Sequence, residues 1–423
     1  MDAREGLTEN ILYAQSGGVT SVINATACGV IKTARASKKF KKVFAAKNGI
    51  LGVLNEEIID TTRESPKVID NLIHTPGGAF GSCRYKLRSI DDDISEYVRL
   101  VDVFKAHKIK YFLYNGGGDS QDTANKVGLL SSKLGHSIYC IGIPKTIDND
   151  LPITDSSPGF GSVAKYVATS TLEASLDVRS MAESSTKVFL FEVMGRNAGW
   201  IAAASGLIKS KSMSAPHLIL FPEIQFDENK FIKKVKEAVI ECGYCVVVAS
   251  EGIKRKDGSF VSDAGSIDAF GHSQLGGVAP LLAGLVKRKL KFKCHWAVSD
   301  YLQRSARHLA SSTDVQQAYA LGEAAVRFAE NDQNMVMPVI RRIPGKKYRW
   351  RIESAKLSRV ANVERKLPRS YITRGGYGIT KKAVEYLLPL IQGEEYPPYA
   401  AGLPCYAHPK NQLISKKLPA FLG

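Results

Sequence analysis

The chain has few cysteines and no long apolar run, and each absence excludes a class of protein. Seven cysteines are scattered among 423 residues, and their odd number argues against a disulfide framework. Cys242 and Cys245 have CxxC spacing, but no second pair completes a zinc site. No run of about 18 apolar residues is present, so no membrane-spanning helix is expected. Residues 1–10 lack the basic and apolar regions of a secretory signal, which predicts a cytoplasmic protein.

The composition is that of an ordinary globular protein with an excess of basic residues. Hydrophobic residues make up 44% of the chain and charged residues 23%, and the length of 423 residues favours two domains. The formal net charge is +17, and residues 341–369 hold eleven lysines and arginines against two glutamates. Such charge suits phosphorylated metabolites or nucleic acid. In residues 348–352, aromatic or apolar residues alternate with arginines, and a turn at residues 343–346 precedes them. This pattern predicts a surface hairpin with a solvated basic face.

Segments of strand and helix character alternate along the chain, which predicts an α/β fold built on parallel sheets. The expected strands are residues 11–15, 42–46, 111–114, 137–143, 188–193, 217–221 and 245–250. The expected helices are residues 21–34, 119–134, 161–182, 231–240 and 312–329.

Nearly every expected strand is followed at once by glycine or by polar residues. The apolar strand at residues 137–143 leads into Pro144-Lys145-Thr146-Ile147-Asp148-Asn149-Asp150, which holds two carboxylates beside a lysine and a threonine. In an open parallel sheet, ligands bind outside the carboxyl ends of the strands. We therefore expect one site assembled from many loops at that edge.

Glycine-rich runs indicate that this site binds phosphate. Ser16-Gly17-Gly18 and Gly116-Gly117-Gly118 precede expected helices, and residues 75–82 form a third run. Main-chain N–H groups at a helix N-terminus bind anions, because the helix dipole and the unpaired donors both favour negative charge. The first two runs are neither Walker A loops nor GxGxxG fingerprints. Together the three runs favour a phosphate site of another kind.

The loops also supply the groups that phosphoryl transfer requires, namely a divalent metal, a base and cations. Asp119 and the pair Asp148 and Asp150 are able to hold Mg²⁺ and to accept a proton. No histidine lies beside a serine or cysteine in these loops, so acyl transfer has little support. The cations available to neutralise phosphate charge are Arg84, Lys145, Arg196 and Arg304.

These motifs, in this order, resemble the phosphofructokinase family, and most closely its pyrophosphate-dependent branch. The resemblance runs from residue 11 to about residue 322. It rests on Ser16-Gly17-Gly18, residues 78–84, residues 116–120, Thr146-Ile147-Asp148-Asn149-Asp150 and Met194-Gly195-Arg196, followed by Glu251 and Tyr301-Leu302-Gln303-Arg304. It implies reversible, Mg²⁺-dependent transfer of a phosphoryl group from pyrophosphate to the 1-hydroxyl of fructose 6-phosphate.

The resemblance also implies two Rossmann-like parallel-sheet α/β domains with the active site in the cleft between them. Residues 1–159 with about 318–380 would bind the phosphoryl donor, and residues 160–317 would bind fructose 6-phosphate. Residues 381–423 would form a C-terminal extension of unassigned role. Because members of the family share sites between subunits, a homodimer or homotetramer is implied. Neither nucleic acid nor a membrane is an expected partner.

Individual roles follow from the resemblance position by position. Asp148 would be the proton acceptor, with Thr146, Ile147 and Asp150 beside it in the substrate site. Further substrate contacts would come from Met194, Gly195, Arg196, Glu251, Tyr301 and Arg304, and from Lys187 reaching a neighbouring subunit. The donor would be bound by Gly17, Gly18, Arg84, Gly117, Asp119, Ser120 and Lys145, and Asp119 would also be a metal ligand.

Two positions differ from ATP-using members of the family and favour pyrophosphate as donor. Those members usually have glycine at the positions of Asp119 and Lys145. The charge of Asp119 would repel the α-phosphate of a nucleotide, and Lys145 would pair with pyrophosphate. The aspartate that usually binds the metal is Gly118 here, and Val315 replaces an arginine for the sugar phosphate. Candidate replacements for that arginine are Arg307, His308 and Arg374.

Three other functions fit parts of the sequence less well. An ATP-dependent phosphofructokinase would not be expected to carry both Asp119 and Lys145. A non-catalytic regulatory subunit would not be expected to keep Asp148, Lys145 and Arg196. A nucleic-acid-binding protein would explain the basic residues 341–369 but would leave the five ordered motifs without a purpose.

Overall fold

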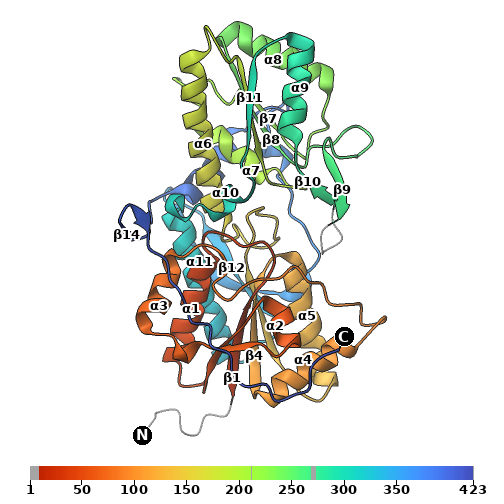
Figure 1. The fold of residues 1–423 in the computed structure, drawn as a ribbon, viewed down its shortest axis with the longest axis vertical. Helices are drawn as coiled ribbons and strands as arrows, with labels where there is room; N and C mark the ends of the chain where they lie inside the picture. Colours follow the sequence, from red (N-terminus) through yellow and green to blue (C-terminus); the bar gives the residue numbers. More distant parts are fainter. Residues whose placement is uncertain (1–8, 211, 268–272, 423) are drawn as a thin grey trace.

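The protein forms two α/β lobes, one above the other in Figure 1. The computed structural model describes residues 9–210, 212–267 and 273–422. Most of residues 1–10, for which the sequence predicts no secretory signal, lies outside these ranges. The lower lobe contains a seven-stranded sheet and the upper lobe a four-stranded sheet. Within the described part of the chain, no helix has the length and apolar character needed to cross a membrane.

The sheet of the lower lobe has the strand order β13-β12-β5-β4-β1-β2-β3. Strands β1, β2, β4, β5 and β12 run parallel, whereas β3 and β13 pair antiparallel at the two edges. The strands are β1 (Asn10–Gln15), β2 (Val43–Ala46), β3 (Ile58–Asp60), β4 (Ile109–Gly116), β5 (Tyr139–Pro144), β12 (Val336–Ile343) and β13 (Arg349–Lys356). Because Gln15 pairs with Asn115 and Gly116 with Pro144, the carboxyl ends of β1, β4 and β5 lie side by side.

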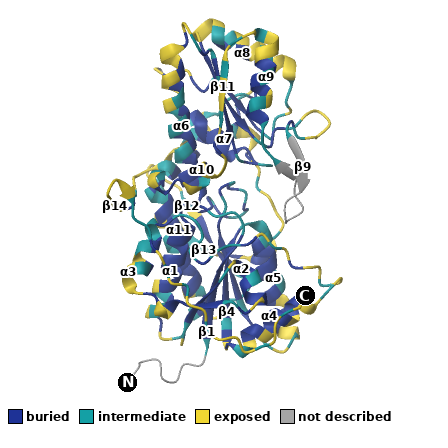
Figure 2. Ribbon diagram, viewed as in Figure 1, coloured by how far each residue is buried: buried dark blue, intermediate teal, exposed yellow. Residues whose placement is uncertain are grey.

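Helices cover both faces of this sheet, because alternate side chains of each strand are apolar and point to opposite faces. In β1, Leu12 and Ala14 pack into one core, while Ile11 and Tyr13 pack into the other. Figure 2 shows the buried strands between the helices. The helices of this lobe are α1 (Ile23–Ala36), α2 (Gly49–Leu54), α3 (Pro66–Asn71), α4 (Ser95–Ala106), α5 (Gly118–Lys133) and α11 (Ser312–Glu330).

The sheet of the upper lobe is fully parallel and has the order β11-β6-β8-β7. Its strands are β6 (Val188–Val193), β7 (Leu218–Leu220), β8 (Cys245–Ser250) and β11 (Cys294–Val298). The helices of this lobe are α6 (Phe160–Met181), α7 (Trp200–Ala204), α8 (Glu228–Cys242), α9 (Val278–Leu290) and α10 (Asp300–Ser305). A small hairpin of β9 (Asp263–Ile267) and β10 (Ser273–Leu275) precedes α9, and α12 (Lys381–Leu387) packs against the core that contains α6 and α7.

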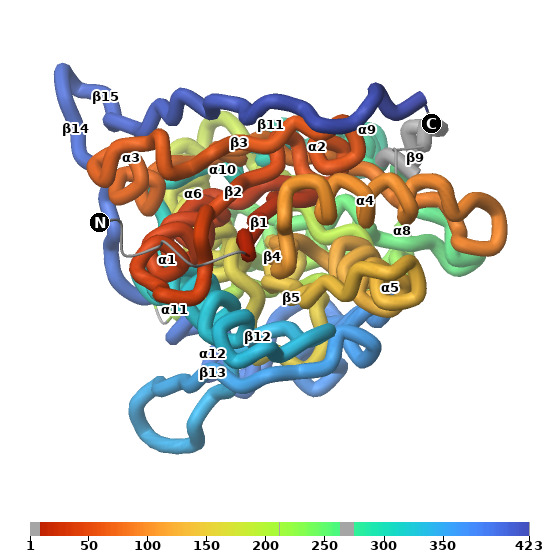
Figure 3. Tube along the Cα trace, turned by 90° about the horizontal axis from the view of Figure 1, so that it is seen from below, coloured from red at the N-terminus to blue at the C-terminus, as the bar shows by residue number. Residues whose placement is uncertain are grey.

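The last part of the chain lies along the lower lobe beside β3 and α2, as Figure 3 shows. After the short strands β14 (Tyr399–Ala400) and β15 (Leu403–Pro404), Leu413 forms an antiparallel bridge with Ile59 of β3. Ile414 N donates to Ile58 O at 2.9 Å, so residues 412–414 extend the sheet beyond β3. This C-terminal strap, residues 405–418, therefore covers a sheet edge that would otherwise present unpaired donors and acceptors.

The predicted α/β fold with two parallel sheets is confirmed, and each expected strand and helix is present within three residues of its expected bounds. The hairpin expected at residues 343–352 is β12 and β13, which are longer than predicted and belong to the main sheet. The sequence did not predict β3, β11, α4 or α9. The domain bounds, including the one at residue 159, stay a prediction.

Candidate active site

The loop after β5 carries the candidate base. Lys145 N donates to Gly116 O at 3.1 Å, which holds the start of the loop beside the end of β4. Asp148 N donates to Thr146 Oγ1 at 3.1 Å. The next residue, Asn149, is fully buried with a left-handed φ of 53°, a conformation that asparagine tolerates better than most residues. The chain therefore turns sharply directly after Asp148.

The surroundings of Asp148 hold it ready to accept a proton. Burial together with the carboxyls of Asp150 and Glu251 raises the pKa of Asp148 to about 8, against the opposing charges of Arg196 and Lys145. A base that titrates near neutral pH is well matched to proton transfer. Glu251 and Arg196 belong to the upper lobe, so both lobes set the chemistry of this carboxyl.

Two further features of this loop region suit a cation. Asp150 Oδ1 is buried without a hydrogen-bond partner among the described residues, and burial raises the pKa of Asp150 despite a hydrogen bond from Thr146. Asp119 lies half-buried in the first turn of α5, directly after Gly117 and Gly118. Within the described ranges, no group of three or more His, Cys, Asp or Glu side chains is arranged so that it could hold a metal ion by itself. A metal would thus rely on one or two carboxylates and on phosphate oxygens, which is how proteins usually hold Mg²⁺.

Three cations converge above the glycine loop that follows β1. Lys145 Nζ donates to Gly18 O at 2.6 Å. A methyl group on Gly17 would lie 3.3 Å from that Nζ. A methyl group on Gly18 would lie 2.7 Å from a guanidinium nitrogen of Arg304 and 3.6 Å from one of Arg84. Gly17 has a left-handed φ of 75°, which favours glycine, and a side chain at Gly18 would displace the guanidinium of Arg304.

This clustering lowers the proton affinity of the lysine at its centre. Burial and the charges of Arg304 and Arg84 lower the pKa of Lys145 to about 7, against the opposing charges of Asp148 and Asp150. Lys145 is only 3% exposed. An anion bound among these cations would favour the charged form of Lys145, and a small polyanion is able to contact all three side chains at once.

Hydrogen bonds tie the glycine loops to one another. Ser82 Oγ donates to Gly17 O at 2.7 Å, and Gly17 N donates to Cys83 O at 2.9 Å. Ser120 Oγ donates to Ser16 Oγ at 2.8 Å, which joins the start of α5 to the end of β1. The three glycine runs that were predicted to bind phosphate thus meet at one place.

The loops after β6 and β8 form the facing wall in the upper lobe. Ser250 Oγ donates to Gly195 O at 2.6 Å, which fixes Met194, Gly195 and Arg196 beside the end of β8. Gly195 has a φ of 124°, at which any other residue would be strained. Burial raises the pKa of Glu251 to about 7 against the charge of Arg196. The wall therefore presents a cation and a carboxyl together.

Helix α10 connects this wall with the donor loops of the lower lobe. Met194 N donates to Gln303 Oε1 at 3.2 Å. The guanidinium of Arg304 lies 3.8 Å from the ring centre of Tyr301, and it also approaches Gly18 of the other lobe. Arg304 thus faces both halves of the site.

Two predicted substrate residues lie elsewhere. Lys187 immediately precedes β6, at the opposite end of the strand from Met194, and its Nζ donates to Glu183 O at 3.2 Å. It is therefore remote from the site of its own chain, as a contact to a neighbouring subunit would require. The side chain of Ile147 packs into the core with Phe160 and Trp200, so it supports the loop from behind.

The candidates for the sugar phosphate do not gather in one place. Arg307 is fully buried, and its guanidinium donates to Ile73 O at 3.2 and 3.1 Å. His308 and Arg374 are exposed, and Val315 is buried among apolar residues of α11 and α1. The structure thus gives Arg307 a role in packing, and the contact to the sugar phosphate stays a prediction.

Two residues that touch the catalytic loop were missed from the sequence. Tyr386 of α12 accepts a hydrogen bond from Asn149 Nδ2 at 2.9 Å and donates to Asp155 O. Arg365 donates to Asn149 O. Both lie more than 200 residues after the loop, and no motif surrounds them, so the sequence held no signal for either contact.

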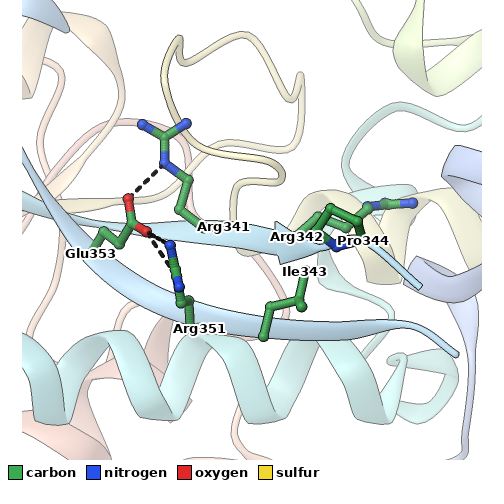
Figure 4. Close-up of a pocket in the computed structure, with 6 residues that line it drawn as sticks. All are labelled: Arg341, Arg342, Ile343, Pro344, Arg351 and Glu353. Carbon is green, nitrogen blue, oxygen red and sulfur yellow. Dashed lines mark hydrogen bonds and ion pairs between the residues drawn. The ribbon is translucent and has the colours of Figure 1, made fainter.

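A separate pocket of about 320 Å³ lies on the basic hairpin of β12 and β13 (Figure 4). Glu353 of β13 accepts a hydrogen bond from Arg341 of β12 at 3.2 Å and one from Arg351 of its own strand at 2.8 Å. Arg342 pairs with Asp155 at 3.1 Å. Glu353 and Asp155 thus offset part of the charge of these three arginines.

Fold and site together define a two-domain α/β phosphotransferase. The profile of the family described as phosphofructokinase matches residues 10–329. The chain belongs to the phosphofructokinase family, as the resemblance predicted.

Relatives along the full chain are similar as well. The pyrophosphate–fructose 6-phosphate 1-phosphotransferase of Halomonas elongata is 57% identical over 413 residues, which is 97% of this chain and 99% of that protein. The crystal structure of the pyrophosphate-dependent phosphofructokinase from Nitrosospira multiformis superimposes with a TM-score of 0.91 at 56% identity, covering 98% of this chain and 100% of the other. The corresponding structure from Marinobacter aquaeolei gives a TM-score of 0.90 at 57% identity, covering 98% and 100%.

Proposed function

We propose that the protein transfers a phosphoryl group reversibly from pyrophosphate to the 1-hydroxyl of fructose 6-phosphate, giving fructose 1,6-bisphosphate and phosphate. The observation that carries this proposal is the buried Lys145 between Arg84 and Arg304, directly above Gly17 and Gly18. Three cations packed over a glycine loop suit a small, highly charged donor. The names of the relatives that match along the full chain support the same reaction.

The chain's own residues divide the work of the transfer. The 1-hydroxyl oxygen of the sugar forms a bond to one phosphorus of pyrophosphate as its proton passes to Asp148. The bond from that phosphorus to the bridging oxygen breaks, and orthophosphate leaves toward Lys145, Arg84 and Arg304. Arg196 on the facing wall would offset charge on the sugar phosphate side. Preorganised cations of this kind lower the barrier because they need no reorientation during reaction.

Mg²⁺ is part of this proposal, because the residues present fit it. The unpartnered Oδ1 of Asp150 and the half-buried Asp119 are the oxygen ligands that the chain offers. When bound, the ion would neutralise part of the phosphate charge and raise the electrophilicity of phosphorus. Asp119 would serve in place of the aspartate that is missing at Gly118.

We further propose that Asp119 and Lys145 together select pyrophosphate over ATP. Lys145 Nζ occupies the space beside Gly17 and binds Gly18 O at 2.6 Å, so it fills the floor of the donor site. Asp119 adds a negative charge where a nucleotide would place its α-phosphate. One feature attracts the smaller donor and the other repels the larger one.

The protein is proposed to act as a homodimer or homotetramer. Strand β11 forms an open edge of the upper sheet, and Trp296 and Val298 on it are 49% and 37% exposed. Helix α10 follows β11 in the chain, and its Tyr301 and Leu302 are 58% and 66% exposed. Large apolar side chains exposed along an edge strand often mark a surface that binds another chain. A cytoplasmic location stays a prediction from the sequence.

Identification of the products tests the reaction. Purified protein is incubated with pyrophosphate, fructose 6-phosphate and Mg²⁺, and phosphorus NMR follows the phosphate species. We expect equal amounts of orthophosphate and fructose 1,6-bisphosphate, and pyrophosphate formation when these two products are supplied instead. Hydrolysis of pyrophosphate without a sugar bisphosphate would contradict the proposal.

A further inference from the structure

Residues 364–367 cross from the lower lobe to the upper lobe directly beside the catalytic loop. They follow β13, have no regular secondary structure and belong to the part of the chain to which no motif assigns a role. Arg365 at their centre is half-buried. Its hydrogen bonds join the loop that carries the base to the loop that carries Arg196.

On the lower side, Arg365 binds the main chain of the catalytic loop at four carbonyl oxygens. Its Nε and Nη2 donate to Asn149 O at 3.1 and 2.8 Å. Its Nη1 donates to Thr154 O at 2.7 Å and to Asp155 O at 3.0 Å. Its main-chain N donates to Asp150 O at 2.6 Å. The loop lacks regular secondary structure, so these bonds satisfy carbonyls that no helix or strand would satisfy.

On the upper side, the same residues hold the start of α7. Trp200, which is 2% exposed, donates from its Nε1 to Arg365 O at 3.1 Å, and its ring lies 4.8 Å from the guanidinium carbon. Glu223 accepts from Gly199 N at 2.9 Å and from Leu367 N at 2.8 Å. Gly199 lies three residues after Arg196. The segment therefore contacts both walls of the active site through buried and half-buried groups.

We propose that Arg365 is a positioning residue for phosphoryl transfer, which fixes the loop of Asp148 and Asp150 and ties it to the loop of Arg196. This inference rests on the function proposed above. The planar guanidinium places five donors in a fixed fork, whereas a lysine ammonium offers one point of charge on a flexible stem. Only arginine is able to bind carbonyls on both ends of the loop at once. A displacement of about 1 Å at a reacting group costs up to about 10²-fold in rate.

The test compares Arg365→Ala with a matched control, Arg35→Ala. Arg35 is also half-buried and donates to two loop carbonyls, Thr61 O and Glu64 O, but it lies at the end of α1, away from the carboxyl edge of the sheet. We expect kcat of Arg365→Ala to fall about 30- to 100-fold, with KM for both substrates changed less than about threefold. We expect kcat of Arg35→Ala to stay within about twofold of the unsubstituted protein.

Two further measurements separate positioning from general instability. Guanidinium or methylguanidinium added to Arg365→Ala is expected to restore at least part of kcat, whereas ammonium is not. Hydrogen exchange of the amides in residues 146–158 is expected to be faster in Arg365→Ala and unchanged in Arg35→Ala. Arg365→Lys, which keeps the charge and much of the packing, is expected to retain a kcat below one tenth of the unsubstituted value.

Equal losses in Arg365→Ala and Arg35→Ala, full activity of Arg365→Lys, or no recovery with guanidinium would overturn the proposal. The ratio of kcat between each variant and the unsubstituted protein is measured with whichever phosphoryl donor the unsubstituted protein uses. The identity of the donor therefore tests the proposed function, while the ratio and the exchange rates test Arg365.

Discussion

At the scale of single residues, the charge on Asp148 depends on its neighbours rather than on its position alone. Burial, Asp150 and Glu251 raise its pKa to about 8, and two cations oppose them. Because a base must be ionised, kcat/KM is expected to rise with pH as Asp148 loses its proton, until loss of the proton of Lys145, whose pKa is about 7, opposes the rise. Asp148→Ala is expected to lower kcat at least ~100-fold and to remove this pH dependence. Steady-state rates between pH 6 and 9 check both outcomes, and a loss below tenfold would contradict the assignment.

A second residue-scale prediction concerns Asp119. Asp119→Gly removes the charge that is proposed to repel a nucleotide, while Lys145 still occupies the floor of the donor site. We expect the ratio of kcat/KM for ATP to that for pyrophosphate to rise at least about tenfold, the value of one favourable charge interaction. Asp122→Asn, also on α5 but paired with Lys126, serves as the control. Pyrophosphate activity left intact with no gain for ATP would contradict the proposed selection.

The residues of the site were predictable where they follow strands. Lys145, Asp148, Arg196 and Glu251 all lie at the carboxyl ends of strands, and the parallel order brings those ends together. Arg365 was not predictable, because it binds main-chain carbonyls and any loop presents those. Arg365 and the carbonyls that it binds are far apart in the sequence, and a main-chain carbonyl carries no feature that identifies its partner.

At the scale of elements, the C-terminal strap has its own anchor in Glu56. Glu56 is 1% exposed and accepts from Lys417 N at 2.6 Å, Leu418 N at 3.1 Å and His107 Nε2 at 2.6 Å. Burial alone would raise the pKa of Glu56, but the hydrogen bonds from Lys417, His107 and Leu418 outweigh it and lower the pKa. Because the pKa of Glu56 is lower in the folded protein than in the unfolded chain, where it is about 4.3, ionised Glu56 stabilises the fold above about pH 4.3. This stabilisation is lost as the pH falls through the pKa of Glu56 in the folded protein.

Glu56→Gln is therefore expected to destabilise the protein by about 2 kcal/mol or more at pH 7, because two main-chain donors lose a charged acceptor. The difference from the unsubstituted protein is expected to shrink below about pH 4. Urea unfolding at pH 7 and at about pH 3 measures it. Glu57→Gln, which removes a partly exposed carboxylate on the same turn, is the control. A difference that is the same at both pH values would contradict the anchor.

Elements with a strong apolar pattern were predicted, and those without one were missed. Strand β8 is six buried apolar or small residues and was evident, whereas β11 is half-exposed and contains a cysteine, a histidine and a tryptophan. Strand β3 is three residues long, too short for periodicity to mark it. Tertiary pairing at the sheet edges, rather than local propensity, produces these strands.

At the scale of the whole molecule, the open edge of β11 predicts an assembly. Trp296→Glu places a charge on the exposed face and is expected to reduce the molecular mass in solution to that of one chain, 46.1 kDa. Sedimentation of the variant and of the unsubstituted protein measures this. Leu403→Glu, an exposed apolar residue on β15, is expected to leave the mass unchanged. A single-chain mass for the unsubstituted protein would contradict the proposed oligomer.

The central claim for the whole molecule is the identity of the phosphoryl donor, and a donor-substitution assay tests it most directly. Purified protein is supplied with fructose 6-phosphate and Mg²⁺ at fixed concentration, and initial rates of fructose 1,6-bisphosphate formation are measured with pyrophosphate or with ATP. With Lys145 above Gly17 and Asp119 beside the cradle, we predict turnover with pyrophosphate and at most a few per cent of that rate with ATP, by the magnitude of charge repulsion in a partly buried site. Rates with ATP equal to those with pyrophosphate would contradict the account.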